Sequence, residues 1–153
     1  MKFALLADKK EAIPQIAKWY FDEWGSYVEE SSVSSFAEKL DQYCNRNDIP
    51  LIILAIINDE VVGAAQLKYR EMTIYPDKAH WLGGVYVAPD FRGQKIASEL
   101  VKQIESTAKK LGVHTLYLQT ENLTGGLYAR LDWQPIEQVN YRKVDVIVMS
   151  KAL

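Results

Sequence analysis

Cysteine is almost absent from this sequence, which has a single one, Cys44, among 153 residues. One thiol forms no internal disulfide, and this absence is typical of proteins from a reducing compartment. Cys44 itself is either a nucleophile or, as a lone cysteine more commonly is, a residue without a chemical role. The chain must therefore be held together by a hydrophobic core.

Long apolar runs and long basic runs are also missing. The longest apolar run, LIILAII at residues 51–57, is far shorter than a membrane span. The apolar run in MKFALLADKK at the start is too short for a signal peptide. We therefore expect a cytoplasmic protein with no membrane partner. The net charge is -2, and without a basic run no nucleic-acid partner is expected.

The composition that remains is that of an ordinary globular domain. Hydrophobic residues make up 48% of the chain and charged residues 25%. No internal repeat or low-complexity linker divides the sequence, so we expect one domain over residues 1–153, long enough for a sizeable core.

Hydrophobic periodicity predicts an α/β (α+β) domain. Its central sheet should be mixed and mostly antiparallel, with about six to seven strands, flanked by about four helices. Gly83 and Gly84 are unusual inside a strand and indicate a bulge or a close approach to the backbone. We expect strands at 3–7, 51–57, 61–69, 80–87, 114–120, 133–139 and 143–151, and helices at 12–24, 33–46, from about residue 93 to 111, and 126–131.

Residues 87–101, VAPDFRGQKIASELV, predict an anion site. A strand ends here, a turn follows, and a long amphipathic helix begins close after Arg92 and Gly93. A helix N-terminus presents unpaired backbone N–H groups and a partial positive charge. Gly93 lets an anion come close to the backbone. The stretch lacks the lysine and serine or threonine of a P-loop, and it is not G-x-G-x-x-G.

The same stretch resembles the acetyl-CoA signature of the GNAT superfamily of N-acetyltransferases. That signature reads Arg/Gln-x-x-Gly-x-Gly/Ala after a strand and a turn, and Arg92 and Ala97 match its ends. Lys95 stands in place of the middle glycine. LYARLDWQPIE at 127–137 resembles the second signature of the family, with Asp132 in place of a turn glycine. The order of elements agrees with the family over nearly the whole chain.

The resemblance implies acetyl-CoA as cosubstrate and no metal. The main chain of one strand would pair with the pantetheine arm, the loop after it would surround the pyrophosphate, and one asparagine would touch the coenzyme. In that order these residues are Val85, Tyr86 and Val87; Arg92, Gly93, Gln94, Lys95, Ile96 and Ala97; and Asn122.

The resemblance also implies catalytic groups. Tyr128 matches the tyrosine that protonates the leaving thiolate, and a phenol is a plausible acid for that step. The base is open between Glu71, His80 and water. The first two helices and the hairpin loops would form the acceptor site for a small-molecule or peptide amine, and an acidic, aromatic-lined mouth there would suit a cationic one. Its candidate lining residues are Trp19, Tyr20, Asp22, Glu23, Trp24, Tyr27, Glu29 and Glu30.

Two other functions remain open at this stage. One is a non-catalytic CoA-binding or interaction module on the same fold, which the substitution at Lys95 and the uncertain base would suit. The other is a general nucleotide-phosphate binder. The last strand, VDVIVMS at 144–150, could also pair across a homodimer.

Overall fold

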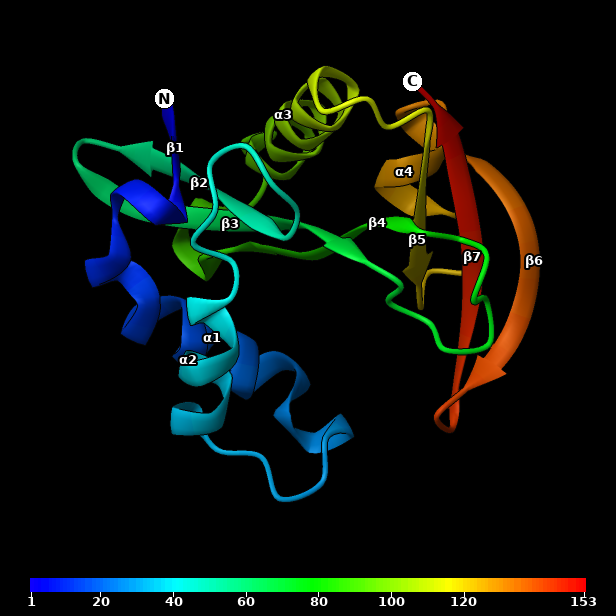
Figure 1. Cartoon of the computed structure of the whole chain (residues 1–153), viewed down its shortest axis with the longest axis horizontal. Helices are drawn as coiled ribbons and strands as arrows, with labels where there is room; N and C mark the ends of the chain where they lie inside the picture. The colour runs from blue at the N-terminus through cyan, green and yellow to red at the C-terminus, as the bar shows by residue number, and fades with distance from the viewer.

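A sheet of seven strands forms the centre of the computed structural model, which describes residues 1–153 (Figure 1). The strand order is β1-β2-β3-β4-β5-β7-β6, and every neighbouring pair is antiparallel except β4 and β5. The predicted mixed, mostly antiparallel sheet is confirmed. The strands are β1 (Lys2–Leu5), β2 (Leu51–Ile57), β3 (Glu60–Tyr69), β4 (His80–Val87), β5 (Thr115–Thr120), β6 (Gln134–Tyr141) and β7 (Val144–Ala152).

The sheet consists of two parts that meet between β4 and β5. These two strands share a single register pair, Trp81 opposite Tyr117. Past Trp81 the strands separate, and Figure 1 shows β2, β3 and β4 running in a different direction from β5, β7 and β6. From Gly83 to Val87, β4 therefore has a strand partner on only one side, and backbone groups on its other side are available to a ligand.

A bulge lies at the glycine pair of β4, as the sequence predicts. The register between β3 and β4 shifts between Ala64 and Gln66, opposite this pair. Gly84 has φ +53°, and a Cβ atom there would lie 2.6 Å from Cδ of Gln66. Only glycine fits this position without strain, because the backbone is left-handed and the neighbouring side chain leaves no room.

Helices cover both faces of the first part of the sheet (Figure 1). On one face, α1 and α2 pack over a core that includes Ile52, Leu54 and Ala64. On the other face, α3 packs over the largest core cluster through residues such as Leu100 and Ile104. The helices are α1 (Ile13–Trp24), α2 (Val33–Asp41), α3 (Ile96–Lys110) and α4 (Gly126–Arg130).

Helix α2 differs from its prediction at both ends. Its cap is Ser32 rather than Ser34 or Ser35, although Ser35 completes the capping box by accepting from the Ser32 N–H. The helix ends at Asp41 instead of residue 46. Asn45 explains the early end, because its side-chain amide donates to the carbonyls of Gln42 and Pro50 and turns the chain toward β2.

The last strand is not available for pairing with a second copy of the chain. β7 lies between β5 and β6, so both of its sides are already paired and that expectation was wrong. The strands at the sheet edges are β1 and β6. None of the helices combines the length and the apolar character that crossing a membrane requires.

Candidate active site

The loop between β4 and α3 exposes main-chain groups at a helix N-terminus. Gly93 has φ +81° and Lys95 has φ +65°. These two left-handed residues delay the start of α3 to Ile96, later than the sequence suggests. No atom lies within 4 Å of a Cβ placed on Gly93, so the loop is open on that side. The first N–H groups of α3 have no intrahelical partner, and they lie where the sequence predicts an anion site.

A groove of about 770 Å³ lies beside this loop. Strand β4 forms one wall, α4 another, and the first turns of α3 close one end. We call it the cofactor groove. Its lining residues are Glu23, Val85, Tyr86, Val87, Phe91, Arg92, Gly93, Lys95, Ile96, Ala97, Ser98, Glu99, Lys102, Leu127, Arg130 and Leu131. Of the predicted coenzyme contacts, only Gln94 and Asn122 are not among them.

Arg92 braces the turn at the end of β4. Its Nε donates to the carbonyl of Val87 at 2.9 Å, and its guanidinium lies over the Tyr86 ring, 5.4 Å from the ring centroid. This contact uses one carbonyl of the strand that the resemblance assigns to the pantetheine arm. The side chain of Arg92 therefore shapes the groove, in addition to bringing positive charge to its edge.

Lys95 keeps the backbone conformation that a glycine would have at this position. Its side chain is exposed, and it makes no capping hydrogen bond to α3. A lysine in the left-handed region carries strain that a glycine would not. The loop keeps its open shape in spite of the substitution, and the residues around the groove fit an anionic group of the pyrophosphate kind.

Asn122 holds the turn that leads into α4. Its Oδ1 accepts hydrogen bonds from the N–H and the hydroxyl of Thr124, at 3.2 and 2.7 Å. The side chain is exposed, and it does not line the cofactor groove. A coenzyme contact by Asn122 stays a prediction.

Tyr128 lies on α4, the short helix beside the second part of the sheet. Its ring packs edge-on against Trp133, with centroids 6.3 Å apart. Burial, and to a smaller extent the charge of Glu71, raise the pKa of Tyr128 to about 12. The phenol therefore keeps its proton throughout the neutral range.

Glu71 lies just after β3, against the bulge of β4. A Cβ atom on Gly83 would lie 2.9 Å from its Oε1, so the absent side chain makes room for the carboxylate. Its Oε1 is 3.4 Å from Nζ of Lys68, and its side chain is 17% exposed. Its Oε2 is buried and has no hydrogen-bond partner. The structure thus brings Glu71 to the middle of the molecule, within electrostatic reach of Tyr128.

His80 lies on the other face of the sheet from Glu71. It pairs with Tyr69 across β3 and β4, with ring centroids 5.4 Å apart. His80 and Leu82 are two residues apart in β4, so they face the same side of the sheet. Leu82 belongs to the core under α3 on that side. Burial and the charge of Arg70 lower the pKa of His80, so the ring is mainly neutral near pH 7. The structure does not bring the two candidate bases together.

Three of the four aromatic residues predicted for the acceptor site, Trp19, Tyr20 and Trp24, lie on α1 against β4. Trp19 stacks on Tyr86 with ring centroids 5.1 Å apart, and Trp24 meets the same ring edge-on at 6.5 Å. Tyr20 donates to the Gly84 carbonyl at 2.7 Å. Tyr27, which is more exposed, reaches Glu121 at the end of β5.

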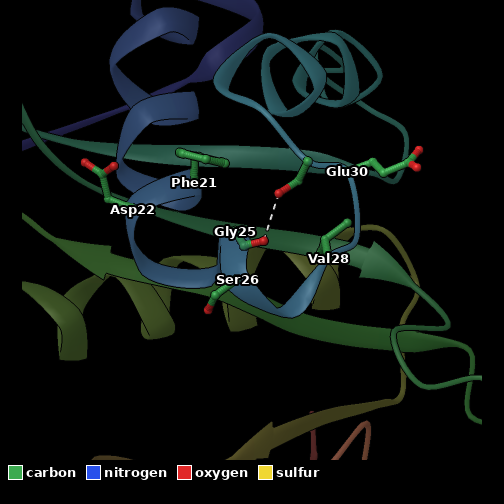
Figure 2. Close-up of a pocket in the computed structure, with 7 residues that line it drawn as sticks. Phe21, Asp22, Gly25, Ser26, Val28 and Glu30 are labelled. Carbon is green, nitrogen blue, oxygen red and sulfur yellow. Dashed lines mark hydrogen bonds between the residues drawn. The ribbon is translucent and has the colours of Figure 1, made fainter.

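The predicted acidic residues do not gather in one mouth. Asp22 pairs with Lys18 on the exposed side of α1, and Glu23 lines the cofactor groove. Glu29 is exposed in the loop that follows. Figure 2 shows a separate notch between α1 and α2, where Asp22 and Glu30 point to opposite sides and Ser31 donates to the Gly25 carbonyl. This notch has no convergent set of polar groups.

The sequence interpretation missed three residues around Glu71. Gln66 and Lys68 are two residues apart in β3, so both face the side covered by α1 and α2. Tyr43 follows α2 in the chain and helps to raise the pKa of Lys68. A signal for two of them was present. A glutamine and a lysine interrupt an otherwise apolar strand, AAQLKY, and Gln66 is only 8% exposed. Polar residues inside a buried strand indicate a role.

Comparison with known proteins agrees with the fold and identifies the family. A parallel pair of strands that separates beside an anion-binding helix N-terminus is suited to an enzyme that holds a phosphorylated cosubstrate. Residues 13–133 match the Acetyltransferase (GNAT) family. The chain therefore belongs to the GNAT family of acetyltransferases.

Individual relatives support this assignment. An acetyltransferase from Pectobacterium atrosepticum is 29% identical over 110 residues, which cover 70% of this chain and 68% of the relative. The fold is similar to that of a ribosomal-protein-alanine N-acetyltransferase from Brucella melitensis, with a TM-score of 0.80, 18% identity and full coverage of both chains. It is also similar to an aminoglycoside 6'-N-acetyltransferase in complex with coenzyme A, with a TM-score of 0.77, 18% identity and coverage of 99% and 97%.

Proposed function

We propose that this protein transfers an acetyl group from acetyl-CoA to a primary amine, by direct attack in a ternary complex. The observation that carries the proposal is the free side of β4. The cofactor groove and the N-terminus of α3 lie at one end of that strand segment, and Glu71 lies at the other, near the glycine pair. A thioester held along β4 would present its carbonyl between these two regions.

Glu71 and Tyr128 are suited to the two proton transfers. The amine nitrogen bonds to the thioester carbonyl carbon, and the C–S bond breaks. Glu71, directly or through water, takes the proton that turns the arriving ammonium into a neutral amine, and the nitrogen loses its second proton to solvent as the amide forms. Tyr128 gives its phenolic proton to the leaving thiolate and later regains one from solvent. We favour Glu71 over His80 as the base, because of these two groups only Glu71 lies close enough for its charge to raise the pKa of Tyr128.

The acceptor in this proposal is a small-molecule or peptide amine that arrives as a cation. The buried, unpartnered oxygen of Glu71 would attract an ammonium group. The structural relatives are named for an aminoglycoside and for a ribosomal-protein alanine, so the likeness of fold does not distinguish these acceptors.

Calorimetric titration with acetyl-CoA, with ATP as the control, tests the cosubstrate. We expect micromolar binding of acetyl-CoA and none of ATP. Absence of acetyl-CoA binding would contradict the proposal and would indicate that Lys95 blocks the groove. Tighter binding of ATP would favour a general nucleotide-phosphate binder.

A second assay tests the transfer itself. Thiol release from acetyl-CoA is measured with kanamycin, spermidine, phenylethylamine and a peptide that begins with alanine, and the products are identified by mass spectrometry. We expect at least one amine to gain one acetyl group for each thiol released. Binding of acetyl-CoA without thiol release on any of these amines would instead support a non-catalytic CoA-binding module.

A further inference from the structure

Lys68 is a charged residue in a place where a strand of this sheet would ordinarily carry an apolar one. It follows Leu67 in β3, and its side chain is only 24% exposed. A Cβ atom on Gly83 would lie 3.1 Å from Cδ of Lys68. The aliphatic part of the Lys68 side chain therefore packs over Gly83, the same glycine that makes room for Glu71. Burying an ammonium group costs free energy unless a partner compensates for the lost water.

The partner of Lys68 is Glu71, with Tyr43 beside them. Burial by itself would lower the pKa of Lys68, but Glu71 and Tyr43 outweigh burial and raise it above its ordinary value. Lys68 is therefore charged at every pH at which the enzyme would work. Its Nζ lies 3.4 Å from Oε1 of Glu71, which fixes one of the two carboxylate oxygens.

The other carboxylate oxygen is left without a donor. Oε2 of Glu71 is buried and accepts no hydrogen bond from the protein. Leaving a buried charged acceptor unpaired is costly, so this oxygen is suited to a donor from a water or a ligand. The next residue, Met72, is fully buried in one cluster with Trp81, which anchors the main chain next to Glu71.

We propose that Lys68 is a positioning residue, which holds one oxygen of Glu71 in place and leaves the other for the acceptor amine. The inference rests on the proposed function, because Glu71 meets an amine only if an amine is the acceptor. Lys68 touches neither substrate in this arrangement, and it acts through Glu71.

The groups around the pair set the direction of the expected pH effect. Lys68 on β3 and Tyr128 on α4 are the ionisable groups that act with Glu71, and Tyr43 after α2 acts on Lys68. Gln66 on β3 and Gly83 on β4 bring no charge. Lys68 is thus the cation that lies against the carboxylate, and Lys68→Met removes that charge.

Four variants test the inference in the acetyl-transfer assay, with spermidine as the acceptor: Lys68→Met, Lys68→Arg, Glu71→Gln, and the double variant Lys68→Met/Glu71→Gln. We expect Lys68→Met to lower kcat/KM about tenfold and to move the acid limb of its pH profile upward. Lys68→Arg should leave kcat/KM and the acid limb close to those of the unsubstituted protein, because it keeps the charge. In the Glu71→Gln background, Lys68→Met should have no further effect. Equal losses in both backgrounds would overturn the inference.

A second measurement needs no acceptor and separates this inference from the proposed function. The carboxyl carbon of Glu71 is followed by NMR in protein labelled at glutamate, and its signal is assigned by its loss in Glu71→Gln. We expect the signal to titrate at a higher pH in Lys68→Met than in the unsubstituted protein and in Lys68→Arg. Titration at the same pH in all three would overturn the role of Lys68, even if acetyl transfer is observed.

Discussion

Glu71 and Tyr128 come from distant segments of the chain, yet the charge of one contributes to the raised pKa of the other. At the residue scale this coupling has a chemical consequence. A phenol with a pKa of about 12 is always protonated at neutral pH, so it can act as an acid. An ordinary thiol has a pKa of about 8.5, which makes the transfer unfavourable in water. A thiolate bound in the cofactor groove would be partly desolvated, which makes it more basic and the transfer easier.

Replacing Tyr128 with phenylalanine should lower kcat about 100-fold. Acetyl-CoA affinity should stay within a few-fold, because the ring still packs against Trp133. Steady-state kinetics and calorimetric titration measure the two quantities. Since the pKa of Tyr128 is raised to about 12, its ionisation should cause no loss of activity below about pH 10. Unchanged turnover in the variant would remove Tyr128 from the mechanism.

Glu71→Gln and His80→Gln form a matched pair of substitutions that decides between the two candidate bases. Glu71→Gln should lower kcat/KM about 100-fold, because the amide cannot accept the amine proton. His80→Gln should change kcat/KM less than about threefold, since His80 lies on the face covered by α3. The opposite pattern in a pH-controlled thiol-release assay would make His80 the base.

The sequence indicated Glu71 and Tyr128 as candidates but could not show that they act together. Glu71 was one of two residues near the right strand, and a loop residue and a buried base look alike in sequence. Its burial depends on Lys68, Gly83 and Met72, which come from β3, β4 and the loop between them. Such convergence is a property of the tertiary fold.

At the scale of single elements, the bulge of β4 determines the room for the Glu71 carboxylate. Gly84→Ala should reduce the free energy of unfolding by about 2–3 kcal/mol, because a Cβ would meet Gln66 at 2.6 Å and φ is +53°. Gly112→Ala is the matched control. Its φ is +86° and no atom lies within 4 Å, so only backbone strain of about 1 kcal/mol is expected. Urea denaturation compares the two, and equal losses would contradict a role for the close contact.

The loop before α3 allows the strain and the charge of Lys95 to be tested apart. Lys95→Gly should raise the free energy of unfolding by up to about 1 kcal/mol, because φ is +65°. Lys95→Met keeps the strain and removes only the charge. If the lysine favours an anionic ligand, Lys95→Met should weaken CoA binding several-fold and make it less sensitive to salt. Binding that strengthens in Lys95→Gly and not in Lys95→Met would instead show that the side chain obstructs the groove.

Element types were predictable from the sequence, and several boundaries were not. The span of α1 and the positions of β2 and β4 follow from apolar periodicity, which local sequence carries. The early end of α2 depends on the side chain of Asn45 reaching Pro50. The late start of α3 depends on a lysine in a left-handed conformation, which no propensity favours. Specific contacts decided these ends.

Over the whole molecule, the two parts of the sheet are joined around Trp81. This side chain is fully buried, its Nε1 donates to the Lys78 carbonyl at 2.7 Å, and its ring lies 5.6 Å from that of Tyr117. The β3–β4 loop crosses the same junction, since Tyr75 donates to Glu137 of β6. The separation of β4 from β5 thus begins at a firmly packed point.

Trp81→Ala should reduce the free energy of unfolding by about 3–5 kcal/mol, as for other large core truncations. Ile53→Val, in the first part of the sheet, should cost only about 0.5–1.5 kcal/mol and serves as the control. Thermal or urea denaturation measures both. A small loss for Trp81→Ala would mean that the two parts hold together without this residue.

The sequence predicted the overall class of fold well, because the order of elements and the two signatures extend over most of the chain. It did not predict the strand order. The last strand, β7, was expected to be free for pairing, whereas it inserts between β5 and β6. An apolar run such as VDVIVMS indicates a strand but not its neighbours, which depend on long-range pairing.

The unpaired side of β4 also gives the protein a built-in reporter. Amides between Gly83 and Val87 that point toward β5 meet no strand there, so their hydrogens should exchange with deuterated solvent faster than those facing β3. A pantetheine arm lying along this side would slow that exchange and leave the β3 side unchanged. Mass spectrometry of one short peptide could then monitor occupancy of the groove, without a label on the ligand and without knowledge of the acceptor.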